Sequence, residues 1–231
     1  MTRKRKQNTT KLEIIQHATR MFLEKGYTHS SVKAISDELD ISTGNLTFYF
    51  PTKEHLLAVL VEMLCDFQRK VMETAVDEGT SSLLALCLEL PCMAAMCEEN
   101  EIARDFYLSA YTHPMTLEII RTNDNIRAKQ VYAPYTANWT EEQFTEAETL
   151  ISGIEYATLM NTPSSAPLHI RVAGALETIL SIYQVPPEIR RLKMEKILAM
   201  DYRTIGRRIL KEFMEYIEIV NEDALKSGGF N

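Results

Sequence analysis

The segment from Ser42 to Phe50 combines residue types and spacing suited to touching nucleic-acid bases. It is predicted to form a short helix that buries Leu46 and Phe50, which lie one turn apart. The outer face of this helix then carries only uncharged polar or aromatic side chains: Thr43, Asn45, Thr47, Phe48 and Tyr49. Such groups are good contacts for base edges, thymine methyl groups and phosphate oxygens. The segment is therefore a candidate for insertion into a DNA groove.

Two short helices are expected to position this face. Ser30 or Ser31 can cap the first, Asp40-Ile41 forms a tight connection, and Ser42 can cap the second before Pro51 ends it. The inner face of the first helix is apolar: Val32, Ile35 and Leu39. Two short helices joined by so few residues fit a helix-turn-helix arrangement.

The residues after Pro51 suggest an anion site. Thr52 can cap a new helix that has Lys53 at its start, so free amides, the positive helix end and an ammonium group coincide. This combination suits a DNA phosphate.

Charge is distributed unevenly along the 231 residues, whose net charge is −7. Residues 1–55 hold nine Lys or Arg against six Asp or Glu, whereas residues 56–185 hold seven against eighteen. The first eleven residues carry five cations and no acid: Arg3, Lys4, Arg5, Lys6 and Lys11. A nucleic acid is thus expected to dock only at the amino-terminal end, and Arg3 to Lys6 could follow the backbone or the minor groove.

A first helix is expected to open at the capping-box pattern Thr10-Lys11-Leu12-Glu13 and to end at Gly26 in a left-handed cap. From Lys53 a long helix leaves the amino-terminal unit. Further helices are predicted at about 82–99, 101–112, 114–132, 141–161, 167–184 and 187–226, with Pro91 kinking or breaking its helix. No strand-like alternation competes, so the fold class is all-α, with domains at 1–55 and 56–231.

Three segments together resemble the DNA-binding domain of TetR-family transcriptional regulators: Ser31 to Ile35, Ile41 to Phe50, and Thr52 to Leu57. The resemblance covers about residues 9–60. It implies an all-helical homodimer that binds a palindromic operator and usually releases it when a small molecule occupies a cavity in the carboxy-terminal domain.

Carried over by position, the resemblance makes Thr43, Asn45, Phe48 and Tyr49 groove-facing and makes Ser31 and Lys53 phosphate contacts. Two positions depart from the family pattern. Thr47 stands where a Tyr is most common, and Pro51 stands where a basic or polar residue is usual. Thr47 is too short for a long-reach phosphate contact, which the basic first residues could offset.

The resemblance also implies a dimer interface of two late helices from each subunit, and we expect them at 141–161 and 167–184. The first places an apolar set on one side: Phe144, Ala147, Ile151, Ile154 and Thr158, with Gly153 close by. The second places Ile170, Ala173, Leu180 and Tyr183 similarly, with Gly174. The alternative is that both are ordinary core helices.

A ligand pocket is a second hypothesis, from adaptable and amphipathic side chains on the middle helices. The candidates are Met93, Met96, Phe106, Tyr107, Tyr111, Trp139, Tyr156 and Met160. Residues of these types at helical spacing more often belong to the hydrophobic core than to a ligand pocket. The acidic balance of 56–185 favours a cationic or neutral ligand over an anionic one.

Other function classes have less support. No GxGxxG, GxxxxGK[ST], HExxH or GxSxG motif occurs, and the five His residues are scattered along the chain. Cys87, Cys92 and Cys97 point in different directions around their helix. Neither an enzyme nor a metal or cofactor site is therefore expected. No apolar run is long enough for a membrane helix and the start carries no secretory pattern, which favours a cytoplasmic protein.

The interpretation is a ligand-responsive DNA-binding regulator, a repressor that binds a palindromic operator as a homodimer and is released by a small apolar or cationic molecule. A helical adaptor that binds another protein, without a small-molecule effector, is the alternative. It explains the body of the chain but not the amino-terminal unit.

Overall fold

The computed structural model describes residues 2–75 and 82–220, with side chains for 11–72 and 82–220, and its regular elements there are all helices. In chain order the helices are α1 (Thr2–Lys25), α2 (Val32–Glu38), α3 (Thr43–Tyr49), α4 (Lys53–Ala75), α5 (Leu83–Glu99), α6 (Glu101–Thr112), α7 (Pro114–Val131), α8 (Glu141–Leu159), α9 (Leu168–Ile182), α10 (Pro187–Leu198) and α11 (Tyr202–Ile219). The predicted all-α fold class is confirmed. No helix in these residues is long and apolar enough to span a bilayer.

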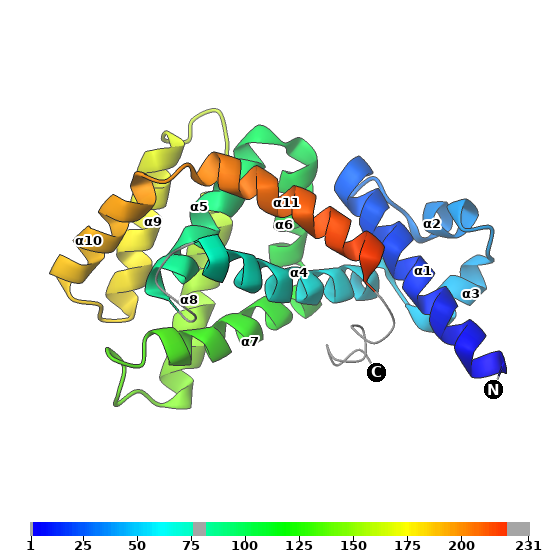
Figure 1. Ribbon diagram of the computed structural model, residues 1–231, viewed down its shortest axis with the longest axis horizontal. Coiled ribbons are helices and arrows are strands. Elements are labelled where there is room, and N and C mark those ends of the chain that lie inside the picture. Colours follow the sequence, from blue (N-terminus) through cyan, green and yellow to red (C-terminus); the bar gives the residue numbers. More distant parts are fainter. Residues whose placement is uncertain (1, 76–81, 221–231) are drawn as a thin grey trace.

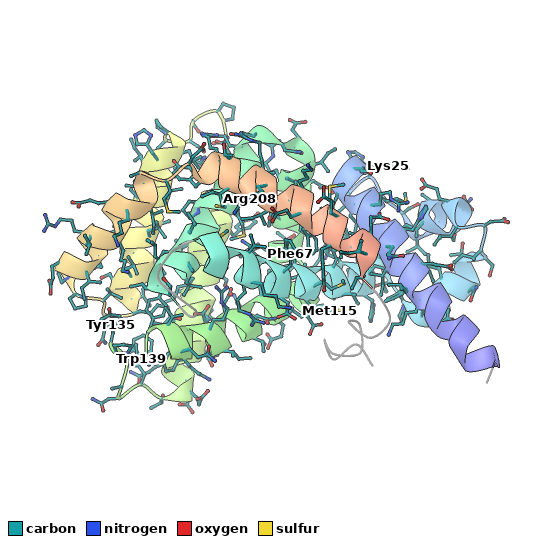
Figure 2. The ribbon with its side chains drawn as sticks, viewed as in Figure 1. Lys25, Phe67, Met115, Tyr135, Trp139 and Arg208 are labelled. Atoms are coloured by element: carbon teal, nitrogen blue, oxygen red, sulfur yellow. The ribbon has the colours of Figure 1, made fainter. Side chains whose placement is uncertain are left out.

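The helices form a small head at one end and a larger body (Figure 1). The head is α1, α2 and α3 with the start of α4, and the body is the remainder of α4 together with α5 to α11. The predicted division after residue 55 falls inside α4, which runs unbroken out of the head. α11 returns from the far end of the body and lies against α1 and α4 (Figure 1). Phe67 on α4 meets Phe213 and Tyr216 on α11, with ring centroids 5.4 and 5.3 Å away (Figure 2).

Local chemistry sets the helix ends of the head as predicted. Gly26 ends α1 with φ of +91°. This backbone conformation is strained for residues that have a Cβ and is readily adopted by glycine. Ser31 caps α2 by accepting a hydrogen bond from the Ala34 amide, and Ser42 caps α3 by accepting one from the Asn45 amide.

The first helix is longer than predicted. It begins at Thr2, so the capping pattern at Thr10 does not start it, and the basic residues expected to follow the DNA backbone or the minor groove are helical. The reason is local, because residues 2–10 contain no Gly or Pro and are rich in Lys, Arg and Gln, which favour helix. Arg3 and Lys4 thus lie on the first turns of α1, and their side chains are outside the described residues.

The prediction of one helix over 187–226 was wrong. The chain breaks at Ala199–Asp201 into α10 and α11, and residues 221–226 lie outside the described part. Asp201 caps α11 by accepting a hydrogen bond from the Thr204 amide at 3.0 Å. Near the break, Leu198 at the end of α10 is 38% exposed, whereas its neighbour Ile197 is buried in the core.

Helix α5 forms the centre of the body and is buried over most of its length. It continues through Pro91, so of the two outcomes expected there, a kink or a break, the break does not occur. Gly206 on α11 lies so close that a Cβ there would come 2.9 Å from the Cys92 carbonyl oxygen on α5. A side chain at Gly206 would push the two helices apart.

The apolar faces expected to form a dimer interface on α8 and α9 instead point into the subunit. Most of the named residues are buried: Phe144, Ala147, Ile151, Thr158, Leu180 and Tyr183. Ile154 and Ala173 are half-buried, and Ile170 is 53% exposed. These helices are amphipathic toward their own core, and sequence periodicity does not distinguish that face from an interface.

Candidate DNA-binding surface and ligand cavity

The candidate reading helix, α3, is held from behind by its two apolar side chains. Leu46 and Phe50 are buried in the head core. The hydroxyls of Ser36 on α2 and Thr43 on α3 are 3.1 Å apart and link the two helices. This packing fixes which face of α3 looks outward.

The outward face consists of Thr43, Asn45 and Phe48, all exposed, with Phe48 at 71%. Tyr49 and Thr47 are half-buried. The Tyr49 ring lies edge-on to the Phe48 ring at 5.2 Å, and the Thr47 hydroxyl donates to the Gly44 carbonyl at 3.3 Å. Exposing the Phe48 ring to water is unfavourable, and α3 carries no charged side chain. The ring and the neighbouring Asn45 amide are suited to contacts with base edges in a DNA groove.

The two residues expected at phosphates have different surroundings. Ser31 is exposed at the start of α2, and because its oxygen already accepts the Ala34 amide, its hydroxyl proton is left for an acceptor. The Lys53 ammonium donates to the Tyr27 carbonyl at 2.9 Å and lies 3.9 Å above the centre of the Tyr27 ring. Burial lowers the pKa of Lys53. Lys53 therefore fixes the turn between α1 and α2, and a phosphate contact by this residue stays a prediction.

The same turn fastens the head to the body. Asp105 on α6 accepts hydrogen bonds from the Thr28 amide, at 2.8 Å, and from the Thr28 hydroxyl. The Tyr27 ring also lies 5.4 Å from the His113 ring at the end of α6. Movement of α6 would therefore be transmitted directly to the head.

The body contains a cavity of about 90 Å³ enclosed by α4 to α9. That is room for several water molecules or for part of a small ligand. Four of the predicted ligand residues line it: Met93, Phe106, Tyr107 and Tyr111. The next residue before Phe106 is Asp105, so one helix both lines the cavity and holds the head.

The other four candidates do not line this cavity. Met96 is buried where α5 meets Gly206 of α11. Trp139 lies in the loop between α7 and α8, far from the head, and packs on Phe144 and Tyr183 (Figure 2). Tyr156 is half-buried against the core near the end of α8, and Met160 is exposed at the residue that caps this helix. Helical spacing alone does not distinguish cavity wall from core or surface.

Sequence reasoning missed the charged residues of the cavity. Arg127 on α7 donates two hydrogen bonds to the Glu89 carboxylate on α5, one of them at 2.8 Å, and both side chains are nearly buried. Three more carboxyl groups line the space: Asp124, Glu148 and Glu155. The spacing of Glu148, Ile151 and Glu155 places them on one face of α8, which is the signal that could have revealed them.

Burial makes these carboxyl groups hard to ionise. It raises the pKa of Glu148 to about 7 and, with the charge of Glu148, that of Glu155 to about 8. Burial and the charges of Glu155 and Glu148 raise the pKa of Asp124 well above its ordinary value. Hydrogen bonds donated by Tyr183 to Glu148 and by Tyr111 to Glu155 oppose these shifts.

The described cysteines are free thiols, and burial raises the pKa of Cys87 to about 12. Over residues 2–75 and 82–220 no group of three His, Cys, Asp or Glu is arranged to hold a metal ion.

Comparison with known proteins matches residues 14–60 to a family model described as bacterial regulatory proteins of the tetR family. A probable HTH-type transcriptional regulator, YttP, of Bacillus subtilis (strain 168) is 33% identical over 83 residues, 36% of this chain and 40% of its own length. The HTH-type transcriptional regulator HbdR of Aromatoleum sp. (strain CIB) is 27% identical over 109 residues, 47% of this chain and 46% of its own. The matches thus span less than half of these relatives.

Among solved structures, a gamma-butyrolactone receptor (ArpA-like protein) aligns over 90% of this chain and 98% of its own, with 18% identity and a TM-score of 0.42. The TetR family protein CprB from S. coelicolor A3(2) aligns over 89% of this chain and 98% of its own, with 20% identity and a TM-score of 0.42. The family match at residues 14–60 covers the whole of the helix-turn-helix unit described above. Residues 14–60 of this chain therefore carry the amino-terminal domain of the tetR family of bacterial regulatory proteins.

Proposed function

We propose that this protein is a ligand-responsive transcriptional repressor that acts in the cytoplasm as a homodimer on a palindromic operator. The observation that carries the proposal is the outward face of α3, where Phe48 and Asn45 are exposed on a helix anchored by buried Leu46 and Phe50. In a dimer, two such helices would enter successive major grooves about 34–36 Å apart.

The cavity and α6 support ligand control. α6 lines the cavity with Phe106, Tyr107 and Tyr111 and holds the head through Asp105. A ligand that binds one position of α6 better than another would shift the spacing of the two heads and release the DNA.

Phe48→Ala is expected to weaken operator binding by about tenfold to a hundredfold, because one good base contact contributes about 1–3 kcal/mol. Asn45→Ala should also remove a base contact, so the variant should discriminate less between the operator and other DNA sequences. The operator is first selected from random and genomic DNA fragments at several salt concentrations, and binding is then measured by fluorescence anisotropy. Since Phe48 is 71% exposed, its removal should leave the unfolding temperature nearly unchanged.

The matched control is Leu192→Ala on α10, which truncates another exposed apolar side chain, 52% exposed, without touching the head. Its DNA affinity should equal that of the wild type. If the wild-type protein retains no fragment even at low salt, the DNA-binding proposal is wrong and a protein-interaction adaptor explains the fold better.

The outer faces of α8 and α9 are the proposed dimer surface. They carry Leu150 and Ile170, 50% and 53% exposed, beside Gly153 and Gly174, where an added Cβ would meet nothing within 4 Å. Small residues next to exposed apolar ones allow two helix pairs to approach closely, so these outer faces, which keep Ile170, Gly153 and Gly174 of the predicted interface and add Leu150, fit a second copy of this chain.

The double variant Leu150→Glu with Ile170→Glu is expected to be monomeric and to lose most operator affinity, because it would bury like charges across the two-fold axis. Light scattering gives the mass of each form. Leu192→Glu, an equally exposed position on α10, should remain dimeric. A monomeric wild-type protein at the concentration that binds DNA would refute the dimer.

A further inference from the structure

The residues that line the body cavity include more acidic than basic side chains. Two of its residues are cationic, Arg69 and Arg127, and both already bind a carboxylate. Arg127 holds Glu89, and Arg69 donates to Asp66 on its own helix at 2.6 Å. Among the residues that the structure describes, Asp124, Glu148 and Glu155 form no ion pair. Three carboxyl groups therefore share one enclosed space without a cation of their own.

The remaining titratable groups that face the cavity bring no positive charge. They are tyrosines and thiols: Tyr107, Tyr111, Tyr132, Tyr183, Cys65 and Cys87. Tyr183 donates a hydrogen bond to Glu148, and Tyr111 donates one to Glu155 at 3.0 Å. The carboxyl group of Asp124 has no hydrogen bond within the described part of the chain. These tyrosines orient two of the carboxyl groups and leave part of each one's hydrogen-bonding capacity for a ligand.

The rest of the lining is apolar or aromatic, with Met93, Phe106 and Ile120 among the wall residues. Such a surface accepts the hydrocarbon body of a ligand, and ring faces attract a cation as well. An inorganic cation has no hydrocarbon body to fill the apolar part of these walls, and an anion would be repelled by the carboxyl groups.

We propose that the cavity binds an organic ammonium compound with an apolar body, whose charged group lies among Asp124, Glu148 and Glu155. The inference deepens the proposed function, because it names the chemical class of the effector, and it depends on that function only for the effect on DNA.

Ligand binding should release protons. In the empty cavity Glu148 and Glu155 hold protons near neutrality, since burial raises their pKa to about 7 and about 8. An ammonium group, which stays charged up to a pH of about 10, stabilises their ionised forms and displaces those protons. Affinity should therefore rise between pH 6 and pH 8.5.

The test measures calorimetric binding of three probes of similar size to the full chain without DNA: 2-phenylethylamine, 2-phenylethanol and phenylacetate. At pH 8.5 the amine is expected to bind at least tenfold more tightly than the alcohol, and phenylacetate more weakly than either. At pH 7, titration in buffers of different ionisation enthalpy should show release of about one proton per amine bound.

The double variant Glu148→Gln with Glu155→Gln should lose the preference for the amine by at least tenfold and keep its affinity for the alcohol. Glu146→Gln, an exposed position on the same helix, is the matched control and should bind like the wild type. Retained affinity for the alcohol shows that the double variant is folded.

Equal affinity for amine and alcohol, an unchanged preference in the double variant, or no binding of the amine at millimolar concentration would each overturn the inference. Operator binding is measured separately. If the protein binds DNA but not the amine, only the proposed effector class is wrong. If it binds the amine but no DNA, the proposed function is wrong and the proposed cation site is still supported.

Discussion

The free energy of unfolding is expected to fall by several kcal/mol as the pH rises from about 5.5 to about 8.5. The cause is the pair of cavity carboxyl groups, Glu148 and Glu155, whose pKa values burial raises from 4.5 to about 7 and about 8. Between the unfolded and the folded pKa values, the folded chain binds more protons than the unfolded chain, so stability decreases with pH. The stabilisation that these two carboxyl groups give the folded state is fully present below a pH of about 4.5 and is lost as the pH rises through 7 and 8. A tenfold difference between the two acid constants of a group corresponds to about 1.4 kcal/mol.

Urea denaturation at pH 5.5, 7.0 and 8.5 measures this slope. The double variant Glu148→Gln with Glu155→Gln should flatten it and should be more stable than the wild type at pH 8.5, because the amide oxygens can still accept hydrogen bonds from Tyr183 and Tyr111. Glu146→Gln should keep the wild-type slope. Parallel profiles for the double variant and the wild type would mean that these carboxyl groups are ionised in the folded protein.

The parts of the fold predicted correctly are those that neighbouring residues determine. Serine hydroxyls at Ser31 and Ser42 satisfy helix amides, and Gly26 adopts a positive φ, so the head could be located from local patterns. The break before α11 has a local signal that was missed, the Asp201 cap. The packing of α11 depends on a distant contact, because Gly206 lies against the Cys92 carbonyl of α5, and periodicity does not report that contact.

Met and aromatic content located only half of the predicted ligand residues at the cavity. Met and aromatic side chains occur in cavity walls, cores and surfaces alike, so Met93 lines the space and Met96 does not. The distinguishing residues are acids, which sequence reasoning treats as solvated by default. Glu148 and Glu155 share a helix face with apolar Ile151, and such a pattern of acids on a buried face is stronger evidence for a polar site than the aromatic content was.

Arg127→Met is expected to destabilise the protein by about 3–5 kcal/mol, because it leaves the Glu89 carboxylate nearly buried without its cation. The loss should exceed that of an ordinary surface substitution for a second reason. The charge of Arg127 also lowers the pKa of Asp124, Glu148 and Glu155, so its removal makes all three harder to ionise. Urea denaturation at pH 7.5 measures the change.

Lys129→Met is the matched control, since Lys129 lies two residues further along α7 and pairs with Glu141, whose side chain is 77% exposed. Its loss should cost only about 0–1 kcal/mol. Adding Glu89→Gln to Arg127→Met should recover part of the stability, because the second change removes the stranded charge. Should Arg127→Met cost no more than Lys129→Met, Glu89 must gain another partner or reach solvent.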